Sequence, residues 1–301
     1  MIRTKQHNRP DFLFYSDLHL REDTPECRTD GDFMEVQTNK LQFIKHLKNQ
    51  WNCPVLISGD IFHKWRSSPF LLAWAIENLP DDIICIPGQH DLPEHSMELL
   101  HKASIYVLEK AEKVRIISEG DYVEIAANDG SIIQVYGFPF GSTLISIEKE
   151  ENITKVALIH ELTYAQKIPY PNCKLDSAGR LLKRLKGWDL IICGDNHLQF
   201  IAIEGNRTLI SPGSITRQTA DQAELLPCVY AYYKDTRKIV PIELPIEENV
   251  VSREHIERKT QRDNRIDAFV SRLKTDWEGA IGCEGNLERL MTENKIKDKV
   301  K

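Results

Sequence analysis

The feature of this sequence that most restricts its fold is a set of short apolar runs, each followed at once by Asp, His or amide side chains. The runs are FLFY, VLI, IICI, VALI and LIIC, which begin at Phe12, Val55, Ile83, Val156 and Leu190. Runs this short and this rich in Ile and Val are typical of buried strands. A sixth run of the same character spans 132–136. The chain is therefore predicted to build a sheet from strands that end in polar side chains.

Helical periodicity separates these runs. A stripe around Leu41 and Ile44 predicts one helix, and Ser68 followed by Pro69 predicts the start of another, with Ser as N-cap and Pro in the first helical position. Further helices are expected over 97–108 and 178–185. Strands that alternate with helices indicate an α/β fold.

The polar residues after the runs carry the expected chemistry. They are Asp17, His19, Asp60, His63, Gln89, His90, Asp91, His160, Asp195 and His197. The carboxyl ends of strands share one edge of an open α/β sheet, so these segments are expected to meet in one pocket. Glycines before Asp60, Gln89 and Asp195 are expected to let the backbone turn sharply off the strand.

Carboxylate oxygen and imidazole nitrogen together favour a site for Mn, Fe or Zn. Two such ions about 3.5–4 Å apart can hold a phosphoryl group, activate water and stabilise a leaving oxygen. Each short motif is weak alone, because a lone Asp-x-His is usually a solvated turn and a lone His at a strand end is usually structural. Five such motifs, each directly after its own predicted strand, together predict a binuclear metal site.

Composition limits the other classes of function. The net charge is −6, which argues against binding nucleic acid through bulk electrostatics. The seven Cys include no CxxC pair, which disfavours a disulfide framework or a zinc ribbon and fits a reducing compartment. No apolar run approaches the roughly 20 residues that span a bilayer, and no signal peptide is apparent before Phe12. We therefore expect a cytoplasmic protein that does not associate with a membrane.

The last part of the chain differs from the rest in composition. Residues 247–301 contain 12 basic and 12 acidic residues among 55, so the body, 1–246, carries the whole negative charge. An amphipathic stripe of Ile266, Phe269, Val270, Leu273 and Trp277 predicts a helix that Gly279 ends. This charged helical tail either folds back on its own domain or docks on a partner.

With these motifs in place, the sequence resembles the calcineurin-like metallophosphoesterases, whose pattern is DxH, GD, GNHD or GNHE, H and GHxH. The resemblance covers roughly 11–244 and implies a four-layer αββα sandwich. Within that family the chain looks most like the Mre11/SbcD nuclease branch. Four features indicate this branch: the motif GDIFH, the insertion 21–33 that ends in Asp32-Phe33, the motif SPGSI at 211–215, and the strands expected over 227–245. SPGSI matches the PGS strand of that branch.

The resemblance assigns a role to each site residue. Asp17, His19, Asp60 and His197 would hold the first metal, and Asp60, Gln89, His160 and Asp195 the second. His90 would protonate the leaving oxygen, Asp91 would orient His90, and His63 would lie beside the substrate phosphate or act as a supporting hydrogen-bonding group. Two positions depart from the family pattern, Gln89 for its Asn and Asp195 for its first GHxH His, and both fall on the second metal. Asp195 favours Mn or Mg over softer ions.

The resemblance implies a metal-dependent DNA exonuclease, with endonuclease activity also possible, of the kind that serves DNA repair and recombination. The implied cofactors are two divalent ions, with Mn²⁺ as the expected metal and Mg²⁺, Fe²⁺ or Zn²⁺ as alternatives. The implied partners are DNA, an SMC-like ATPase of the Rad50/SbcC type on the C-terminal helix, and a second copy of the chain in a homodimer. Two alternatives stay open: a phosphoesterase for small nucleotides or phosphoproteins, and a weakly active scaffold for the ATPase.

Overall fold

The computed structural model describes the backbone of residues 9–165 and 175–280, with side chains up to residue 272. The internal contacts of the chain divide it into two compact units, with the boundary between Val251 and Ser252. Leu273 and Trp277 of the predicted stripe belong to helix α5, but their side chains lie outside the described residues.

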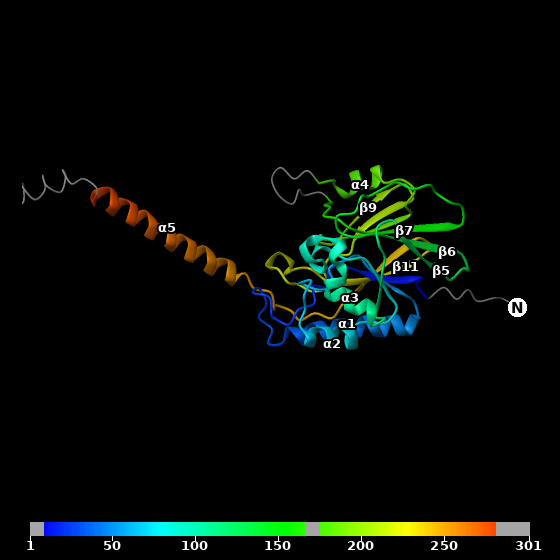
Figure 1. Ribbon diagram of the computed structural model, residues 1–301, viewed down its shortest axis with the longest axis horizontal. Coiled ribbons are helices and arrows are strands. Elements are labelled where there is room, and N and C mark those ends of the chain that lie inside the picture. Colours follow the sequence, from blue (N-terminus) through cyan, green and yellow to red (C-terminus); the bar gives the residue numbers. More distant parts are fainter. Residues whose placement is uncertain (1–8, 166–174, 281–301) are drawn as a thin grey trace, which may run out of the picture. The chain divides into compact units, whose positions relative to one another are not determined.

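The first unit contains two six-stranded sheets (Figure 1). The first sheet has the order β12-β11-β1-β2-β3-β4 and consists of β1 (Phe12–Tyr15), β2 (Val55–Ile57), β3 (Ile83–Cys85), β4 (Val114–Ile116), β11 (Cys228–Tyr233) and β12 (Lys238–Glu243). Strands β1 to β4 are parallel, β11 pairs antiparallel with β1, and β12 pairs antiparallel with β11.

The second sheet has the order β5-β6-β7-β8-β10-β9. Its strands are β5 (Tyr122–Ala126), β6 (Ile132–Phe138), β7 (Ile153–His160), β8 (Leu190–Gly194), β9 (Phe200–Glu204) and β10 (Arg207–Ser211). Strands β6, β7, β8 and β10 are parallel, while the edge strands β5 and β9 are antiparallel to their neighbours.

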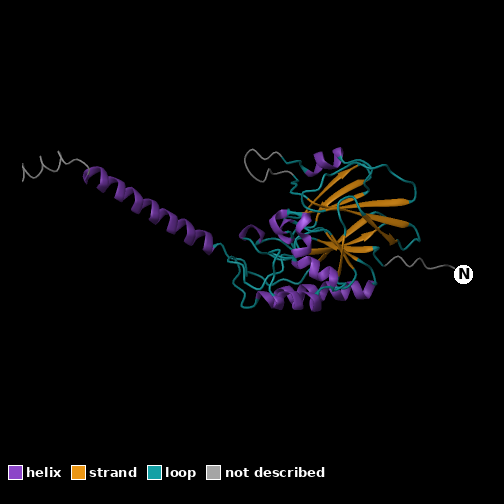
Figure 2. Ribbon diagram, in the orientation of Figure 1, coloured by secondary structure: helices purple, strands orange, loops and turns teal. Residues whose placement is uncertain are grey.

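Three apolar clusters define four layers. Phe14 and Leu56 of the first sheet pack with Leu158 and Ile192 of the second in the cluster between the sheets. A second cluster lies between the first sheet and helices α1 (Phe33–Trp51), α2 (Pro69–Asn78) and α3 (Ser104–Lys110), and a third between the second sheet and α4 (Ala178–Arg184). Figure 2 shows the sheets between these helices. The predicted αββα sandwich is confirmed.

The helix starts follow the capping residues in the sequence. Asp32 accepts hydrogen bonds from the amides of Met34 and Glu35 at the start of α1, and Ser68 accepts one from Leu71 at the start of α2. The start of α2 at Ser68-Pro69 is confirmed.

Two predicted elements differ from the structure. The single helix expected over 97–108 is a 3-10 helix, Met97–Lys102, followed by α3. Ala103 is extended between them, so that the amide of Ser104 donates to the carbonyl of Trp65 instead of continuing the helix. The strand expected within SPGSI ends at Ser211, and Ser214 beyond it turns towards the site, where its hydroxyl donates to the carbonyl of Asp17.

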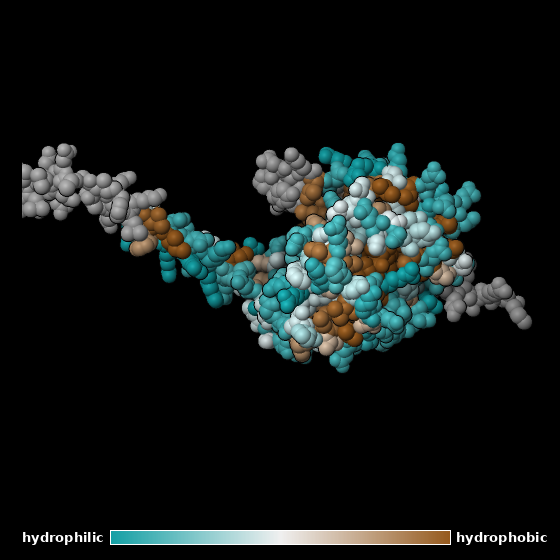
Figure 3. Space-filling model, viewed as in Figure 1, coloured by the Kyte–Doolittle hydropathy of each residue, from teal (hydrophilic) through white to brown (hydrophobic). Residues whose placement is uncertain are grey.

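The segment 245–251 leads to the second unit and is fastened to the body. Arg217 donates to the carbonyl of Glu247, and the amide of Thr29 donates to the carbonyl of Val250 at 2.9 Å. In the second unit, α5 spans Glu254–Ala280 and begins twelve residues before the predicted stripe. Figure 3 shows apolar side chains along this helix between hydrophilic ones. No helix in the described ranges is long and apolar enough to cross a membrane.

Candidate metal centre

The polar residues after the apolar runs come together from both sheets. Asp17 and His19 follow β1, Asp60 follows β2, His160 ends β7, and Asp195 follows β8. Ligand atoms of Asp17, His19 and His197 all lie within 4.8 Å of one another, and so do those of Asp17, Asp60 and His160. Segments nearly 180 residues apart therefore meet at strand ends, as predicted, but the strands belong to two sheets rather than to a single sheet edge.

In the group of Asp17, His19 and His197, two imidazole nitrogens face each other. Nε2 of His19 lies 3.0 Å from Nε2 of His197, and Nε2 of His197 lies 3.9 Å from Oδ1 of Asp17. Burial lowers the pKa of His19 well below its ordinary value. A neutral imidazole is the form that binds a metal, so His19 is already in the state that a ligand needs.

Asp60 connects the two groups. Its Oδ2 lies 3.6 Å from Nε2 of His19 and 3.4 Å from Nε2 of His160, and the side chain is fully buried. Burial alone would raise the pKa of Asp60, but the imidazoles of His160 and His19 hold it well below its ordinary value. Asp60 is thus an anion between two sets of ligand atoms, as expected of a carboxylate that bridges two ions.

His160 is oriented by the backbone. Its Nδ1 lies 2.6 Å from the carbonyl oxygen of Ser58, which can only accept, so Nδ1 carries a proton and Nε2 is directed at Asp60. Burial disfavours the imidazolium, but the carboxylate of Asp60 outweighs this and raises the pKa of His160 to about 10. The buried acidic groups therefore require positive charge at this point, and a divalent cation can supply it.

Buried polar atoms without a hydrogen-bond partner test whether a cation fits. The side-chain atoms of this kind at the site, which are buried and have no hydrogen-bond partner among the described residues, are Oδ2 of Asp17, Oδ2 of Asp60, Oε1 of Gln89 and Nε2 of His160. Leaving such groups unpaired costs about 1–3 kcal/mol each, and more for charged ones. Oxygen and imidazole donors of this kind suit divalent ions of the Mn, Fe and Zn class. The residues present therefore fit a metal centre.

The two departures from the family pattern contact each other. Nε2 of Gln89 donates to Oδ1 of Asp195 at 2.5 Å, which leaves Oε1 of Gln89 as the unpartnered buried oxygen. The amide of Asp195 in turn donates to Oδ1 of Asp17 at 3.1 Å. The longer Gln and the acidic Asp195 thus form one linked pair at the position assigned to the second metal.

Asp91 does not contact the His90 ring. Its carboxylate is fully buried and accepts hydrogen bonds from the backbone amides of Ile61, Phe62 and Gly88 at 2.9–3.1 Å. Asp91 therefore fastens the loop after β3 to the loop after β2, and the expectation that it orients the His90 ring is not what the structure shows.

The group that orients His90 is a backbone carbonyl. Nδ1 of His90 lies 2.9 Å from the carbonyl oxygen of His63, and the amide of His90 donates to Oδ1 of Asp60 at 2.9 Å. The rings of His63 and His90 are stacked with centroids 5.7 Å apart, and both approach His19 edge-on. Burial lowers the pKa of His63 to about 4, so this ring is neutral near pH 7.

Close approach explains the glycines of these loops better than sharp turning does. Of the glycines before Asp60, Gln89 and Asp195, only Gly59 has a positive φ, +98°. At Gly88 a Cβ would lie 2.2 Å from Oδ1 of Asp60, and at Gly194 it would lie 2.0 Å from the carbonyl of Ser58. The loops pack so tightly around the buried carboxylate that no side chain fits there.

Four candidate ligands have backbone conformations that L-residues rarely adopt. Asp17, His19, Asp60 and Asp195 have φ values of 52°, 46°, 54° and 78°. Such residues cost of order 1–3 kcal/mol each and cluster at functional sites. Their concentration in one site indicates that the backbone is held for the sake of the ligand geometry.

Several supporting residues escaped the sequence reasoning. Asn196 donates from Nδ2 to the carbonyl of Thr163 at 2.6 Å, and Gln218 donates to the carbonyl of His19 at 3.2 Å. Asn196 lies inside the GDNH motif, so its position was a usable signal. Gln218 acts through a backbone contact 199 residues away, which no local pattern reports.

The chain was also compared with known proteins. No family model matches the chain, and no curated protein matches its sequence. Among solved structures, the chain is similar to an archaeal phosphodiesterase, with 15% identity, a TM-score of 0.40, and 77% of this chain and 99% of that chain covered. It is also similar to a candidate 5′-nucleotidase from Staphylococcus aureus in complex with α-ketoglutarate, with 12% identity, a TM-score of 0.44, and 83% and 58% covered.

Proposed function

We propose that this protein is a metal-dependent phosphodiesterase that binds two divalent ions and acts on nucleic acid. The observation that carries the proposal is the position of Asp60, whose buried, unpartnered Oδ2 lies between Nε2 of His19 and Nε2 of His160. A carboxylate shared by two ligand groups is the arrangement that two-metal phosphoryl chemistry uses.

The residues divide into two ligand groups and a set that faces the substrate. Asp17, His19, Asp60 and His197 would hold one ion, and Asp60, Gln89, His160 and Asp195 the other. Bound divalent ions would supply the positive charge that a phosphodiester requires and activate water for attack. In an acidic body with a net charge of −6, this charge cannot come from a basic surface alone.

The chain's own residues would handle the proton of the leaving group. His90 protonates the leaving oxygen from Nε2, because Nδ1 is occupied by the carbonyl of His63. The stacked His63 ring keeps His90 aligned and faces the phosphate. Proton transfer by a positioned imidazole contributes typically 10²–10⁴-fold to a rate.

We further propose that the substrate is DNA and that the enzyme is a nuclease of the Mre11/SbcD type. The support is the set of motifs in the sequence: GDIFH, the 21–33 insertion and SPGSI. A homodimer belongs to this proposal as well.

For the tail, we propose docking on an SMC-like ATPase. Phe269 is 61% exposed, and Ile266 and Val270 are also exposed on α5. An amphipathic helix needs a partner surface to cover such a face. Phe269→Ala is expected to weaken ATPase binding by about 2 kcal/mol, the range of an interface anchor.

One experiment separates the candidate functions. The full chain is incubated with Mn²⁺ and single-stranded DNA, double-stranded DNA, bis(p-nitrophenyl) phosphate or thymidine 5′-monophosphate, with Asp60→Asn as the inactive control. Release of nucleotides from DNA by the wild type alone supports the nuclease. Hydrolysis of the monophosphate but not of DNA indicates a small-nucleotide phosphoesterase. Absence of all hydrolysis contradicts the enzyme and leaves the scaffold alternative.

A further inference from the structure

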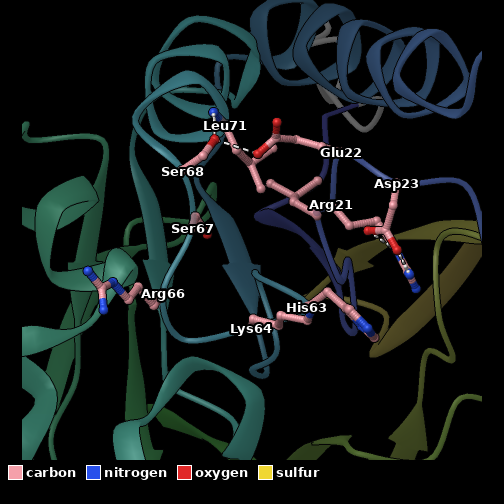
Figure 4. Close-up of a pocket in the computed structure, with 10 residues that line it drawn as sticks. Arg21, Glu22, Asp23, His63, Lys64, Arg66, Ser67, Ser68 and Leu71 are labelled. Carbon is pink, nitrogen blue, oxygen red and sulfur yellow. Dashed lines mark hydrogen bonds and ion pairs between the residues drawn. The ribbon is translucent and has the colours of Figure 1, made fainter.

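A pocket of about 360 Å³ adjoins the metal centre through His63. One wall is the loop of residues 20–23 that follows His19, and the other is the segment 63–68 that leads from β2 into α2, with Leu71 beyond it (Figure 4). Ligand pockets usually hold about 300–1,000 Å³. This volume is at the lower end of that range, which suits one nucleotide rather than a duplex.

The two walls are fixed to each other and to the body. The amide of His63 donates to the carbonyl of Leu20 at 3.1 Å. Gln37 of α1 holds residue 21 from both sides, because it accepts from the amide of Arg21 at 3.1 Å and donates to its carbonyl at 2.8 Å. The amide of Ser67 donates to the hydroxyl of Ser104 at 2.7 Å. A pocket with such fixed walls pays little ordering cost when a ligand binds.

The acidic side chains of the pocket are already partnered. Asp23 is paired with Arg21, and Glu22 accepts a hydrogen bond from Ser68, as Figure 4 shows. Lys64 and Arg66 line the same pocket, are exposed, and form no ion pair with any residue in the described ranges. The pocket thus offers two uncommitted cations at its rim and the hydroxyl of Ser67, above the buried side chains of Leu20 and Leu71.

We infer that this pocket binds the nucleotide next to the scissile bond. Lys64 and Arg66 hold its phosphate, and the sugar and base lie between the two walls of the pocket. The inference rests on the proposed function and specifies its substrate: a strand whose flanking nucleotide carries a phosphate. His63 lies at the junction, since it lines the pocket and stacks on His90.

The test removes the two cations without touching the metal centre. The variant is Lys64→Ala/Arg66→Ala, and the matched control is Lys183→Ala/Lys186→Ala, which removes two exposed lysines at α4, on the opposite outer layer. Two substrates are compared with Mn²⁺: a short single-stranded oligonucleotide, and bis(p-nitrophenyl) phosphate, which has no flanking nucleotide. Binding of thymidine 5′-monophosphate to each full chain is measured as well.

We expect kcat/KM of the pocket variant on the oligonucleotide to fall about tenfold or more, with hydrolysis of the aryl diester unchanged. The salt dependence of oligonucleotide binding should lose a slope of about 0.7, because the two cations neutralise one phosphate of a single strand. The control should match the wild type. Equal loss on both substrates, equal loss in the control, or an unchanged salt slope would each overturn the inference.

The monophosphate binding assay separates this inference from the proposed function. If the wild type hydrolyses neither substrate, the proposed function fails, yet weaker monophosphate binding by the pocket variant alone would still support the pocket. If the wild type hydrolyses both substrates and the variant binds the monophosphate as tightly, the pocket inference fails while the proposed function stands.

Discussion

Nε2 of His160 lies 3.4 Å from Oδ2 of Asp60, and neither atom has a hydrogen-bond partner in the part of the chain that the structure describes. Both side chains are buried, and Nδ1 of the histidine is committed to the carbonyl of Ser58. A cation between the two atoms would satisfy both at once. This relationship is the physical basis for the metal centre, and the predictions below depend on it.

Gly88→Ala should disrupt the centre without altering any ligand. The new Cβ would lie 2.2 Å from Oδ1 of Asp60, although the φ of Gly88, −93°, suits any residue. We expect Mn²⁺ affinity to fall at least tenfold, measured by calorimetry. The matched control is Gly179→Ala in α4, where nothing lies within 4 Å; it should keep full affinity and gain about 0.5–1 kcal/mol in unfolding free energy. Unchanged binding in Gly88→Ala would contradict the tight packing around Asp60.

His90→Ala should separate catalysis from metal binding. Nδ1 of His90 is held by the carbonyl of His63, and the ring packs edge-on against His19 without belonging to either group of residues assigned to an ion, so metal content should match the wild type. Hydrolysis of DNA should fall about 10²-fold or more, because a poor leaving group needs a proton donor. The loss should be much smaller for bis(p-nitrophenyl) phosphate, whose leaving group needs none. Equal losses on both substrates, or loss of metal as in Asp60→Asn, would refute the role of proton donor.

Gln89 and Asp195 should act as a unit. Because Nε2 of Gln89 donates to Oδ1 of Asp195, removing either side chain releases the other. We measure the binding free energy of the weaker Mn²⁺ ion in a double-mutant cycle with Gln89→Ala and Asp195→Ala. The change in the double variant should differ from the sum of the single changes by about 0.5–3 kcal/mol, the range for residues in contact. Strict additivity would show that the pair does not shape the site jointly.

The point of truncation should decide whether the body keeps its stability. Segment 245–251 gives Arg217 and Thr29 their carbonyl acceptors at Glu247 and Val250. A chain ending at residue 251 should unfold like the full body and still cleave the aryl diester. One ending at 246 should lose about 1–3 kcal/mol, because buried Arg217 is left with an unpaired donor. Denaturant unfolding measures both, and equal stability of the two would rule out this fastening.

Much of the fold could be predicted because its signals are local. FLFY and VLI coincide with β1 and β2, and Asp32 and Ser68 begin helices where their capping chemistry indicates. Strands β4, β5 and β9 were not predicted, and the strand expected within SPGSI is β10, which ends at Ser211. Ile201 and Ile203 lie exposed on the edge strand β9, so its sequence lacks the buried pattern of a strand.

The residues that form the site could be predicted, but the contacts between them could not. The motif order identified Asp17, Asp60 and His160 as neighbours, and ligand atoms of all three lie within 4.8 Å. The orientation of His90 could not be foreseen, because the partner is a backbone carbonyl with no sequence signature. The Gln89–Asp195 contact joins residues 106 positions apart, and only the folded chain shows that these two side chains are hydrogen-bonded to each other.

The most direct test of the account is the number of Mn²⁺ ions bound per chain, determined by calorimetric titration together with elemental analysis of the protein at saturation. Asp60→Asn serves as the comparison, since it keeps the shape of the side chain and removes its charge. The account predicts two ions for the wild type and, for the variant, much weaker binding at both positions. A wild-type chain that binds no divalent ion, or an Asp60→Asn variant that binds two as tightly, would contradict it.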